Sequence, residues 1–107
     1  MKITTAIIFS CFALFSAHGA DPKSNWMNNC MQCHAPDGSA NTAMAKALNA
    51  KDFTNPQIQS SFTDAQAAAA IKDGVTKDGI TRMVAFGGTL SDDEIKALVA
   101  YVRSLKK

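Results

Sequence analysis

Two cysteines and a histidine, Cys30, Cys33 and His34, lie within five consecutive residues in the first third of the chain. A disulfide between cysteines this close in sequence would close only a small loop and would stabilise a fold little. On a helix, the spacing places both thiols about one turn apart, with the histidine directly after them. A domain this small usually needs a disulfide, a metal or a cofactor for stability. Because a disulfide here would contribute little, we expect one cofactor to engage all three side chains.

This pattern is typical of covalent haem attachment, in which the thiols form thioethers and the next histidine binds the iron. A thioredoxin-like redox pair would need a preceding strand and a β-α-β pattern, and the sequence shows neither. A structural zinc site would need four ligands, typically from two such pairs. A plain disulfide would leave His34 unexplained. We therefore predict one covalently attached haem c, held by Cys30 and Cys33, with His34 on the iron.

Residues 1–20 predict a secretory signal peptide. A positively charged start and an uncharged stretch up to Ala17 precede small residues, with the cut after Gly19 or Ala20. A membrane anchor is the alternative, but the apolar run is short of the roughly 20 residues of a spanning helix. Cys11 lies too early for a lipoprotein signal. We expect an exported protein of the periplasm, or of the thylakoid lumen or another extracytoplasmic space, without membrane insertion after cleavage.

The remaining residues, 21–107, suffice for one small domain. Cleavage removes Lys2, Cys11 and His18, which leaves ten basic and nine acidic residues. This near balance argues against nucleic acid or an anionic membrane surface as the partner. We expect a monomer. Cleavage also leaves the attachment motif with the last two cysteines and the last histidine of the chain.

Helical signals run along this domain, and no alternating apolar–polar pattern predicts a strand. Asp21 before Pro22 predicts the start of a helix that continues through Cys33. We expect a short helix over residues 42–48. Residues 51–61, which contain a proline, should be irregular.

The two best-marked helices carry capping boxes. Thr63 with Gln66 predicts an alanine-rich helix that ends at Gly74. Ser91 with Glu94 predicts the last helix. Its apolar residues recur at helical spacing, namely Ile95, Leu98, Val99, Val102 and Leu105. We therefore predict an all-α domain of about four to five short helices wrapped around one haem.

The sixth iron ligand is sought among the methionines, because no second histidine remains after cleavage. Met27 and Met31 belong to the segment of the attachment cysteines and should stay on the side of His34. Met44 follows that segment closely and should line the pocket. Met83 lies in a stretch without helical signals that is long enough to reach the other face of the haem. Elimination favours Met83, although any methionine can simply fill a core.

At these residues the sequence resembles the class I monohaem cytochromes c, especially the small soluble bacterial and algal kind. The resemblance covers essentially all of residues 21–107. It rests on the attachment motif, Asp37-Gly38, Asp78-Gly79, Met83, Phe86 and the run from Leu90 to Val102. It implies that Met83 is the sixth ligand. It also implies that the first and last helices cross near the haem, with Trp26 and Tyr101 packing at the crossing.

Two positions depart from the pattern of this family. Val84 follows Met83, where the family usually has a proline. The family also often has a proline after the attachment motif, whose carbonyl accepts a hydrogen bond from the proximal histidine. No proline lies between Pro36 and Pro56, so a backbone carbonyl near Met44–Ala45 is the candidate acceptor.

With His34 and Met83 both on the iron, no position is vacant for a substrate, and outer-sphere electron transfer remains. Methionine with histidine raises the reduction potential relative to two histidines, and an apolar pocket raises it further. The candidate lining residues are Leu48, Phe53, Ile71, Ile80, Phe86 and Leu98. We predict a soluble electron carrier, not an enzyme. Its partners would be redox proteins such as respiratory or photosynthetic complexes, including an oxidase or a dehydrogenase.

Two other functions stay open at this point. A haem-based ligand-binding or sensor protein, or a peroxidase-like protein, would have a displaceable sixth ligand, and the missing proline after the methionine is compatible with this. A dedicated electron-entry subunit of one dehydrogenase would share the same haem chemistry. The absorption spectrum distinguishes a ligand-binding or peroxidase-like protein from a carrier. The oligomeric state helps to distinguish a dehydrogenase subunit from a carrier.

The docking surface is predicted from three basic residues. Lys72, Lys77 and Arg82 should lie near the haem edge. Asp73 and Asp78 are interleaved with them, so an ordinary solvated face is the expectation rather than a basic recognition patch.

Overall fold

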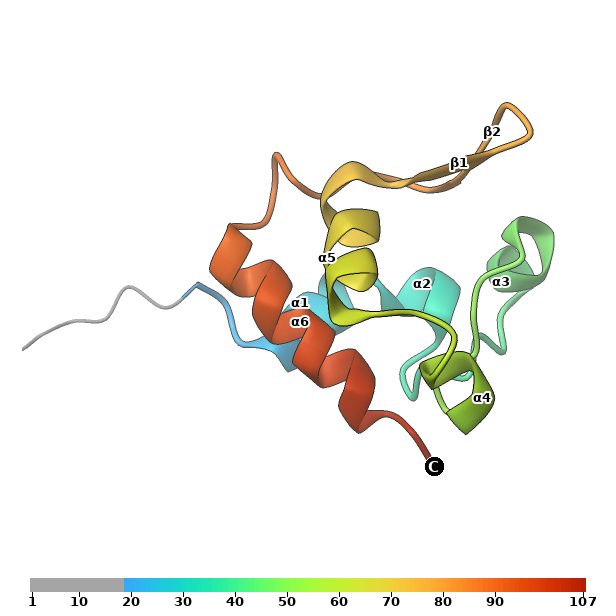
Figure 1. Ribbon diagram of the computed structural model, residues 1–107, viewed down its shortest axis with the longest axis horizontal. Coiled ribbons are helices and arrows are strands. Elements are labelled where there is room, and N and C mark those ends of the chain that lie inside the picture. The colour runs from blue at the N-terminus through green and yellow to red at the C-terminus, as the bar shows by residue number, and fades with distance from the viewer. Residues whose placement is uncertain (1–18) are drawn as a thin grey trace, which may run out of the picture.

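The computed structural model describes residues 19–107, so the predicted signal peptide lies outside the described residues apart from Gly19 and Ala20. The described part contains six helices and one two-stranded sheet. The longer helices form the body of the domain, and a hairpin projects from it (Figure 1). Within residues 19–107, no helix combines the length and apolar character needed to cross a membrane.

The N-terminal helix breaks at the first attachment cysteine. α1 (Pro22–Asn29) has proline at its first position, as predicted, and α2 (Met31–His34) follows it at once. Cys30 lies between them with φ −114° and ψ −33°. Its N–H donates to the Trp26 carbonyl at 2.9 Å, and its own carbonyl accepts the His34 N–H at 2.9 Å. The predicted single helix is therefore two helices whose hydrogen bonds run across the break.

Two short helices follow the motif. α3 (Ala43–Leu48) begins where predicted, with Thr42 as its N-cap. α4 (Pro56–Gln59) is capped by Asn55 and occupies part of the stretch 51–61 that was predicted to be irregular. A helix of four residues is too short to show an apolar repeat, which is why the sequence pattern does not indicate it.

Both predicted capping boxes are present. α5 (Asp64–Asp73) begins after Thr63, and α6 (Asp92–Ser104) begins after Ser91. In each helix the cap hydroxyl accepts the backbone N–H three residues on, and the side chain there accepts the cap N–H. Loss of such a cap typically costs about 1 kcal/mol. α5 ends at Gly74, as predicted.

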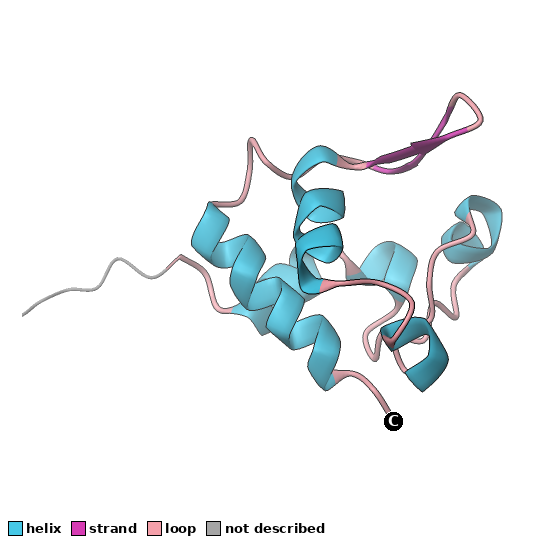
Figure 2. Ribbon diagram, in the orientation of Figure 1, coloured by secondary structure: helices cyan, strands magenta, loops and turns pink. Residues whose placement is uncertain are grey.

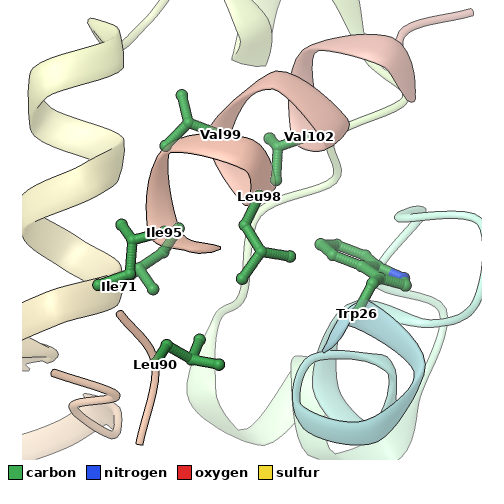
Figure 3. Packing of buried hydrophobic residues seen from close by; sticks show 7 residues of the cluster. All are labelled: Trp26, Ile71, Leu90, Ile95, Leu98, Val99 and Val102. Atoms are coloured by element: carbon green, nitrogen blue, oxygen red, sulfur yellow. The ribbon is translucent and has the colours of Figure 1, made fainter. Parts of the chain in front are cut away.

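The core forms where α6 packs against α1 and α5. Trp26 and Leu98 are each only 1% exposed, and Figure 3 shows Leu98 between Trp26 on one side and Ile71 on the other. The buried apolar cluster comprises Trp26, Ile71, Leu90, Ile95, Leu98, Val99 and Val102. Full burial of one such aliphatic side chain contributes about 1.5–3 kcal/mol. The predicted apolar face of the last helix is therefore the centre of this core.

The domain is not purely helical, because an antiparallel hairpin follows α5. β1 (Val75–Lys77) pairs with β2 (Ile80–Met83), and Figure 2 shows this pair in magenta, apart from the helices. Asp78 and Gly79 form the turn with φ values of 55° and 73°. An Asp-Gly pair with two positive φ angles is typical of a two-residue type I′ turn. The all-α prediction is therefore wrong for residues 75–83. β1 is exposed throughout, β2 is exposed in its first half, and neither strand carries the apolar alternation that would indicate it.

Candidate functional site

A pocket of about 480 Å³ lies beside α2. All the long helices, the segment after α3 and the hairpin contribute to its wall. Its volume falls within the roughly 300–1,000 Å³ usual for organic ligands and cofactors. Cys30, Cys33, His34 and Met83 all line it. The fold thus brings Met83 to the same cavity as the attachment motif, although the two are far apart in the sequence.

Cys30 and Cys33 carry free, half-buried thiols at the junction of α1 and α2. Burial, together with the neighbouring Cys33, raises the pKa of the Cys30 thiol to about 11. A thiol with this pKa is protonated at neutral pH and is a poor metal ligand or nucleophile by itself. The two cysteines line the pocket about one helical turn apart, which suits two thioether bonds to a single flat group.

The imidazole of His34 is oriented by one main-chain hydrogen bond. Its Nδ1 lies 3.2 Å from the carbonyl oxygen of Lys51. Because a carbonyl can only accept, Nδ1 carries the proton and Nε2 keeps its lone pair. Burial lowers the pKa of His34, against the opposing effect of this hydrogen bond. The prediction of an acceptor near Met44–Ala45 is wrong. The carbonyls of these two residues lie within α3, and the carbonyl that accepts from His34 belongs to Lys51, in the segment after α3.

Aromatic rings enclose the imidazole. The ring of Phe53 stacks on that of His34, with centroids 4.7 Å apart and an interplanar angle of 23°. The Trp26 ring lies 5.8 Å from the same imidazole. Trp26 is itself fixed, because its Nε1 donates to the carbonyls of Ala35 and Pro36 at 3.1 and 3.2 Å. The orientation of His34 is therefore set by packing as well as by hydrogen bonding.

The loop after the motif is bonded back to α2. The Thr42 hydroxyl donates to the Cys33 carbonyl at 2.7 Å and accepts the Ala45 N–H at 3.0 Å. The N–H of Ala40 donates to the His34 carbonyl at 2.9 Å. These bonds satisfy carbonyls at the end of α2 that lack helical partners, so the motif is held at both its side chains and its main chain.

Met83 approaches the pocket at the end of β2. Its side chain is half-buried and packs against the central apolar cluster. The next residue, Val84, is 60% exposed. Met83 therefore lies in the part of β2 that lines the pocket, next to Thr81 and Arg82.

The structure places most of the predicted apolar lining in the pocket. These residues are Leu48, Phe53, Ile71, Phe86 and Leu98. The prediction is wrong for Ile80, which lies next to the hairpin turn and is 48% exposed. The reason is the hairpin itself, which projects from the body of the domain (Figure 1), because Ile80 begins β2 directly after the turn.

The predicted aromatic contact between the first and last helices is confirmed. The rings of Trp26 and Tyr101 lie 5.6 Å apart, tilted by 47°, where α1 packs against α6. Aromatic pairs at this distance contribute about 0.5–1.5 kcal/mol beyond their buried area. The contact ties α1, which leads into the attachment motif, to the largest element of the core.

The basic residues predicted near the haem edge do not form one patch. Lys72 makes an ion pair with Asp92 at 3.3 Å, and both side chains are exposed. Lys77 is exposed on β1, whereas Arg82 is half-buried and lines the pocket. This dispersal agrees with the expectation of an ordinary solvated face.

The side chains present fit a covalently attached haem. The pocket wall is largely apolar and is lined by two cysteines, a methionine and a histidine whose Nε2 makes no hydrogen bond within residues 19–107. A flat apolar macrocycle with a central iron needs these groups. Cys30, Cys33, His34 and Met83 are the residues that would hold it.

A family model described as cytochrome c oxidase, cbb3-type, subunit III matches residues 17–102, which includes all four of these residues. The chain belongs to this family. It is a c-type cytochrome domain with a covalently bound haem c and its iron, and its chemistry is haem-based electron transfer.

The structure is also similar to solved c-type cytochromes. The structure named KustC0563 c-type cytochrome has a TM-score of 0.73 and 30% identity, over 82% of this chain and 100% of that chain. A mutant of Kustc0563 has a TM-score of 0.70 and 29% identity, over 81% of this chain and 100% of that chain. No curated protein matches the chain. These likenesses support the predicted small cytochrome c fold.

Two features of the site are missing from the sequence predictions. The carbonyl of Lys51 carries no side-chain signal, because any residue at that position offers the same acceptor. The hairpin that positions Met83 does carry one, since Asp78-Gly79 is a strong turn signal.

Proposed function

We propose that this protein is an exported one-electron carrier, not an enzyme. Its haem would be attached at Cys30 and Cys33, and His34 and Met83 would bind the iron. The signal peptide, residues 1–20, would be removed, and residues 21–107 would work as a soluble monomer in the periplasm or a comparable extracytoplasmic space.

One observation carries the ligand assignment: His34 and Met83 line the same pocket from different elements. The Nδ1 of His34 is engaged at the Lys51 carbonyl, which leaves Nε2 for the iron. Fixing one ring nitrogen in this way is the usual means of orienting a histidine ligand.

The other methionines of the described chain are worse placed. Met27 and Met44 are 39% and 52% exposed, and neither they nor Met31 line the pocket. Among residues 19–107, Met83 is therefore the one methionine that lines the pocket. This distribution supports the argument by elimination.

When bound, haem supplies an iron that alternates between the ferrous and ferric states. His34 and Met83 would both hold the iron, and no binding site on it would be left for a substrate. The apolar lining, which includes Ile71, Phe86 and Leu98, disfavours the extra positive charge of the ferric state. Methionine ligation acts in the same direction, so the residues of this chain favour a positive reduction potential.

The partners would be larger redox complexes. The family description names an oxidase subunit, and an oxidase or a dehydrogenase is the class of partner that a small carrier of positive potential serves. Docking would bring such a partner to the pocket side of the domain, where residues of the hairpin and of the segment after α3 line the pocket.

Ligation is tested by absorption spectra and potentiometry of the ferric and ferrous holoprotein. We expect the far-red band of methionine-ligated ferric haem at neutral pH, a positive midpoint potential and no carbon monoxide binding. Met83→Ala should abolish the band, whereas Met44→Ala, at a methionine that is 52% exposed, should retain it. A missing band together with ready carbon monoxide binding in the unchanged protein would contradict the carrier and favour the ligand-binding function.

Attachment and processing are tested by mass spectrometry of the denatured protein. Haem should remain bound to the chain, and Cys30→Ser with Cys33→Ser should release it. The mature chain should begin at Ala20 or Asp21. Haem that dissociates on denaturation of the unchanged protein would contradict thioether attachment.

A further inference from the structure

The segment that carries Met83 leaves from and returns to the last turn of α5. It leaves at Gly74 and returns where the N–H groups of Phe86 and Gly87 donate to the carbonyls of Ile71 and Lys72, at 2.8 and 3.0 Å. These carbonyls belong to the C-terminal turn of α5, which has acceptors to spare. Both ends of the Met83 segment are therefore fixed at one place on the body of the domain.

Gly74 has the tightest surroundings of the glycines along this segment. Its φ of 74° and ψ of −177° lie in a region essentially restricted to glycine. A Cβ at this position would lie 2.6 Å from the Met83 carbonyl oxygen and 3.0 Å from the Ala85 nitrogen. These neighbours are main-chain atoms, so no side chain can rotate away to make room. The missing Cβ lets residues 83–85 close against the end of α5.

Gly79, at the hairpin turn, provides a contrast. Its φ is 73°, close to that of Gly74, yet nothing lies within 4 Å of the place where its Cβ would be. The turn geometry explains Gly79 by itself. At Gly74 the conformation and the close approach to Met83 occur together.

The strand pairing adds a second constraint at the same point. Val75 pairs with Met83 but Thr76 pairs with Thr81, so β2 has one more residue than β1 there. Such a bulge re-aims the side chains that follow it and is common beside functional sites. Val75, the residue that pairs with Met83, directly follows Gly74. The bulge that directs the Met83 side chain therefore lies next to Gly74 in the structure.

We propose that Gly74 is a positioning residue for Met83, holding the ligand segment closed against the end of α5 in place of the proline that is absent at Val84. The inference rests on the proposed ligation of the iron by Met83. Gly74 touches the main chain of Met83 and acts on the iron only through it. A side chain at position 74 should therefore favour the state in which Met83 has left the iron.

The test is a titration of ferric holoprotein with free imidazole, comparing Gly74→Ala with Gly79→Ala. Imidazole binds only where Met83 has dissociated, so its apparent affinity rises in proportion to that open population. We expect about tenfold tighter imidazole binding and a weaker far-red band in Gly74→Ala. Gly79→Ala also places alanine at a positive φ, at the turn of the hairpin. Its affinity for imidazole should lie within about twofold of that of the unchanged protein.

A second pair covers the possibility that Gly74→Ala does not fold. A Cβ on Gly87 would lie 2.9 Å from the Lys72 carbonyl oxygen, whereas nothing lies within 4 Å of that place on Gly88. Gly87→Ala should loosen the returning end of the segment and tighten imidazole binding severalfold relative to Gly88→Ala. Far-UV circular dichroism checks that the helices persist in each variant.

Met83→Ala separates the two hypotheses. In one outcome, Met83→Ala binds imidazole far more tightly than the unchanged protein, but Gly74→Ala binds it like Gly79→Ala, and Gly87→Ala binds it like Gly88→Ala. The positioning role of Gly74 is then wrong, and the ligation of the iron by Met83 stands. If Gly74→Ala cannot be obtained folded, equal affinities in the Gly87 and Gly88 variants overturn the inference. If Met83→Ala does not change imidazole binding, the proposed ligation itself fails.

Discussion

His34 and Met83 reach one pocket from two regions of very different construction. The His34 side, residues 26–53, holds its ligand by a hydrogen bond to a main-chain carbonyl, by stacking on Phe53 and by contact with the buried Trp26. The Met83 side, residues 74–87, contains a hairpin that is exposed around its turn, and its described hydrogen bonds to α5 are made where the segment returns to that helix. One region is part of the core, and the other is attached to it.

This difference has a consequence for how the domain opens. Segments with few buried apolar contacts and exposed backbone hydrogen bonds open locally at low free energy, whereas core segments open only with global unfolding. The Met83 side should therefore release its ligand without disturbing the His34 side. The bond between iron and Met83 is then the weak point of the proposed site, and thioether attachment at Cys30 and Cys33 belongs to the strong region.

The largest effect is expected from Trp26→Ala, which removes the centre of the His34 side. Trp26 is 1% exposed, and its indole N–H donates to two carbonyls just after the motif. Truncation of a buried tryptophan costs about 3–5 kcal/mol of unfolding free energy. Guanidinium unfolding followed by far-UV circular dichroism measures the loss.

The matched change on the Met83 side is Ile80→Ala, at a residue that is 48% exposed. It should alter the unfolding free energy by no more than about 0.5 kcal/mol. Similar losses for Trp26→Ala and Ile80→Ala would break the comparison between the two regions.

An intermediate effect is expected from Thr42→Val, which keeps the shape of the side chain but removes its hydroxyl. The hydroxyl caps α3 and donates to the Cys33 carbonyl, and loss of an N-cap costs about 0.5–2 kcal/mol. The same substitution on the Met83 side, Thr76→Val on an exposed strand, should lie within about 0.5 kcal/mol of the unchanged protein. Equilibrium unfolding of both variants decides whether the difference between the regions extends to single hydroxyl groups.

The smallest effect is expected at Glu94, which joins the start of α6 to α1. One carboxylate oxygen accepts from the Asn25 amide at 2.9 Å, and the other accepts the Ser91 N–H at 3.1 Å. These hydrogen bonds, that from Asn25 first, lower the pKa of Glu94. A carboxyl whose pKa is depressed by folding adds stability above its unfolded pKa of about 4.3. That stability is lost as the pH falls through the folded value.

Glu94→Gln should therefore lose less stability than the unchanged protein when the pH falls from about 5 to below 4. Asp93→Asn, in the same exposed first turn of α6, provides the control for removal of one negative charge. Thermal unfolding across this pH range measures both. Parallel pH profiles for Glu94→Gln and the unchanged protein would show that this link contributes nothing.

The parts of the fold predicted from the sequence are those with local signals. The capping boxes that begin at Thr63 and Ser91 mark the starts of α5 and α6, and each of these signals is contained in four consecutive residues. The apolar repeat of α6 then determines which of its residues are buried. The attachment motif is equally local, because its three side chains act within little more than one helical turn.

The features that escaped prediction depend on contacts distant in sequence or on exposed backbone. The Lys51 carbonyl becomes an acceptor for His34 only after the chain has turned around α3. The apolar side chain of Ile80 is of a type usually found in a core, but its place in the hairpin leaves it 48% exposed. The interruption of the first helix at Cys30 involves one residue with nearly helical angles, which no residue preference indicates.

The acceptor for His34 is a main-chain atom in a short segment fixed at both ends. The Ala50 N–H donates to the Ala45 carbonyl at 2.9 Å, and the Phe53 N–H donates to the Gly38 carbonyl at 2.8 Å. The identity of the side chain at position 51 is therefore free to drift among homologous proteins without loss of the hydrogen bond. The number of residues between positions 50 and 53 is not, because one insertion or deletion would move a different peptide group beneath the imidazole.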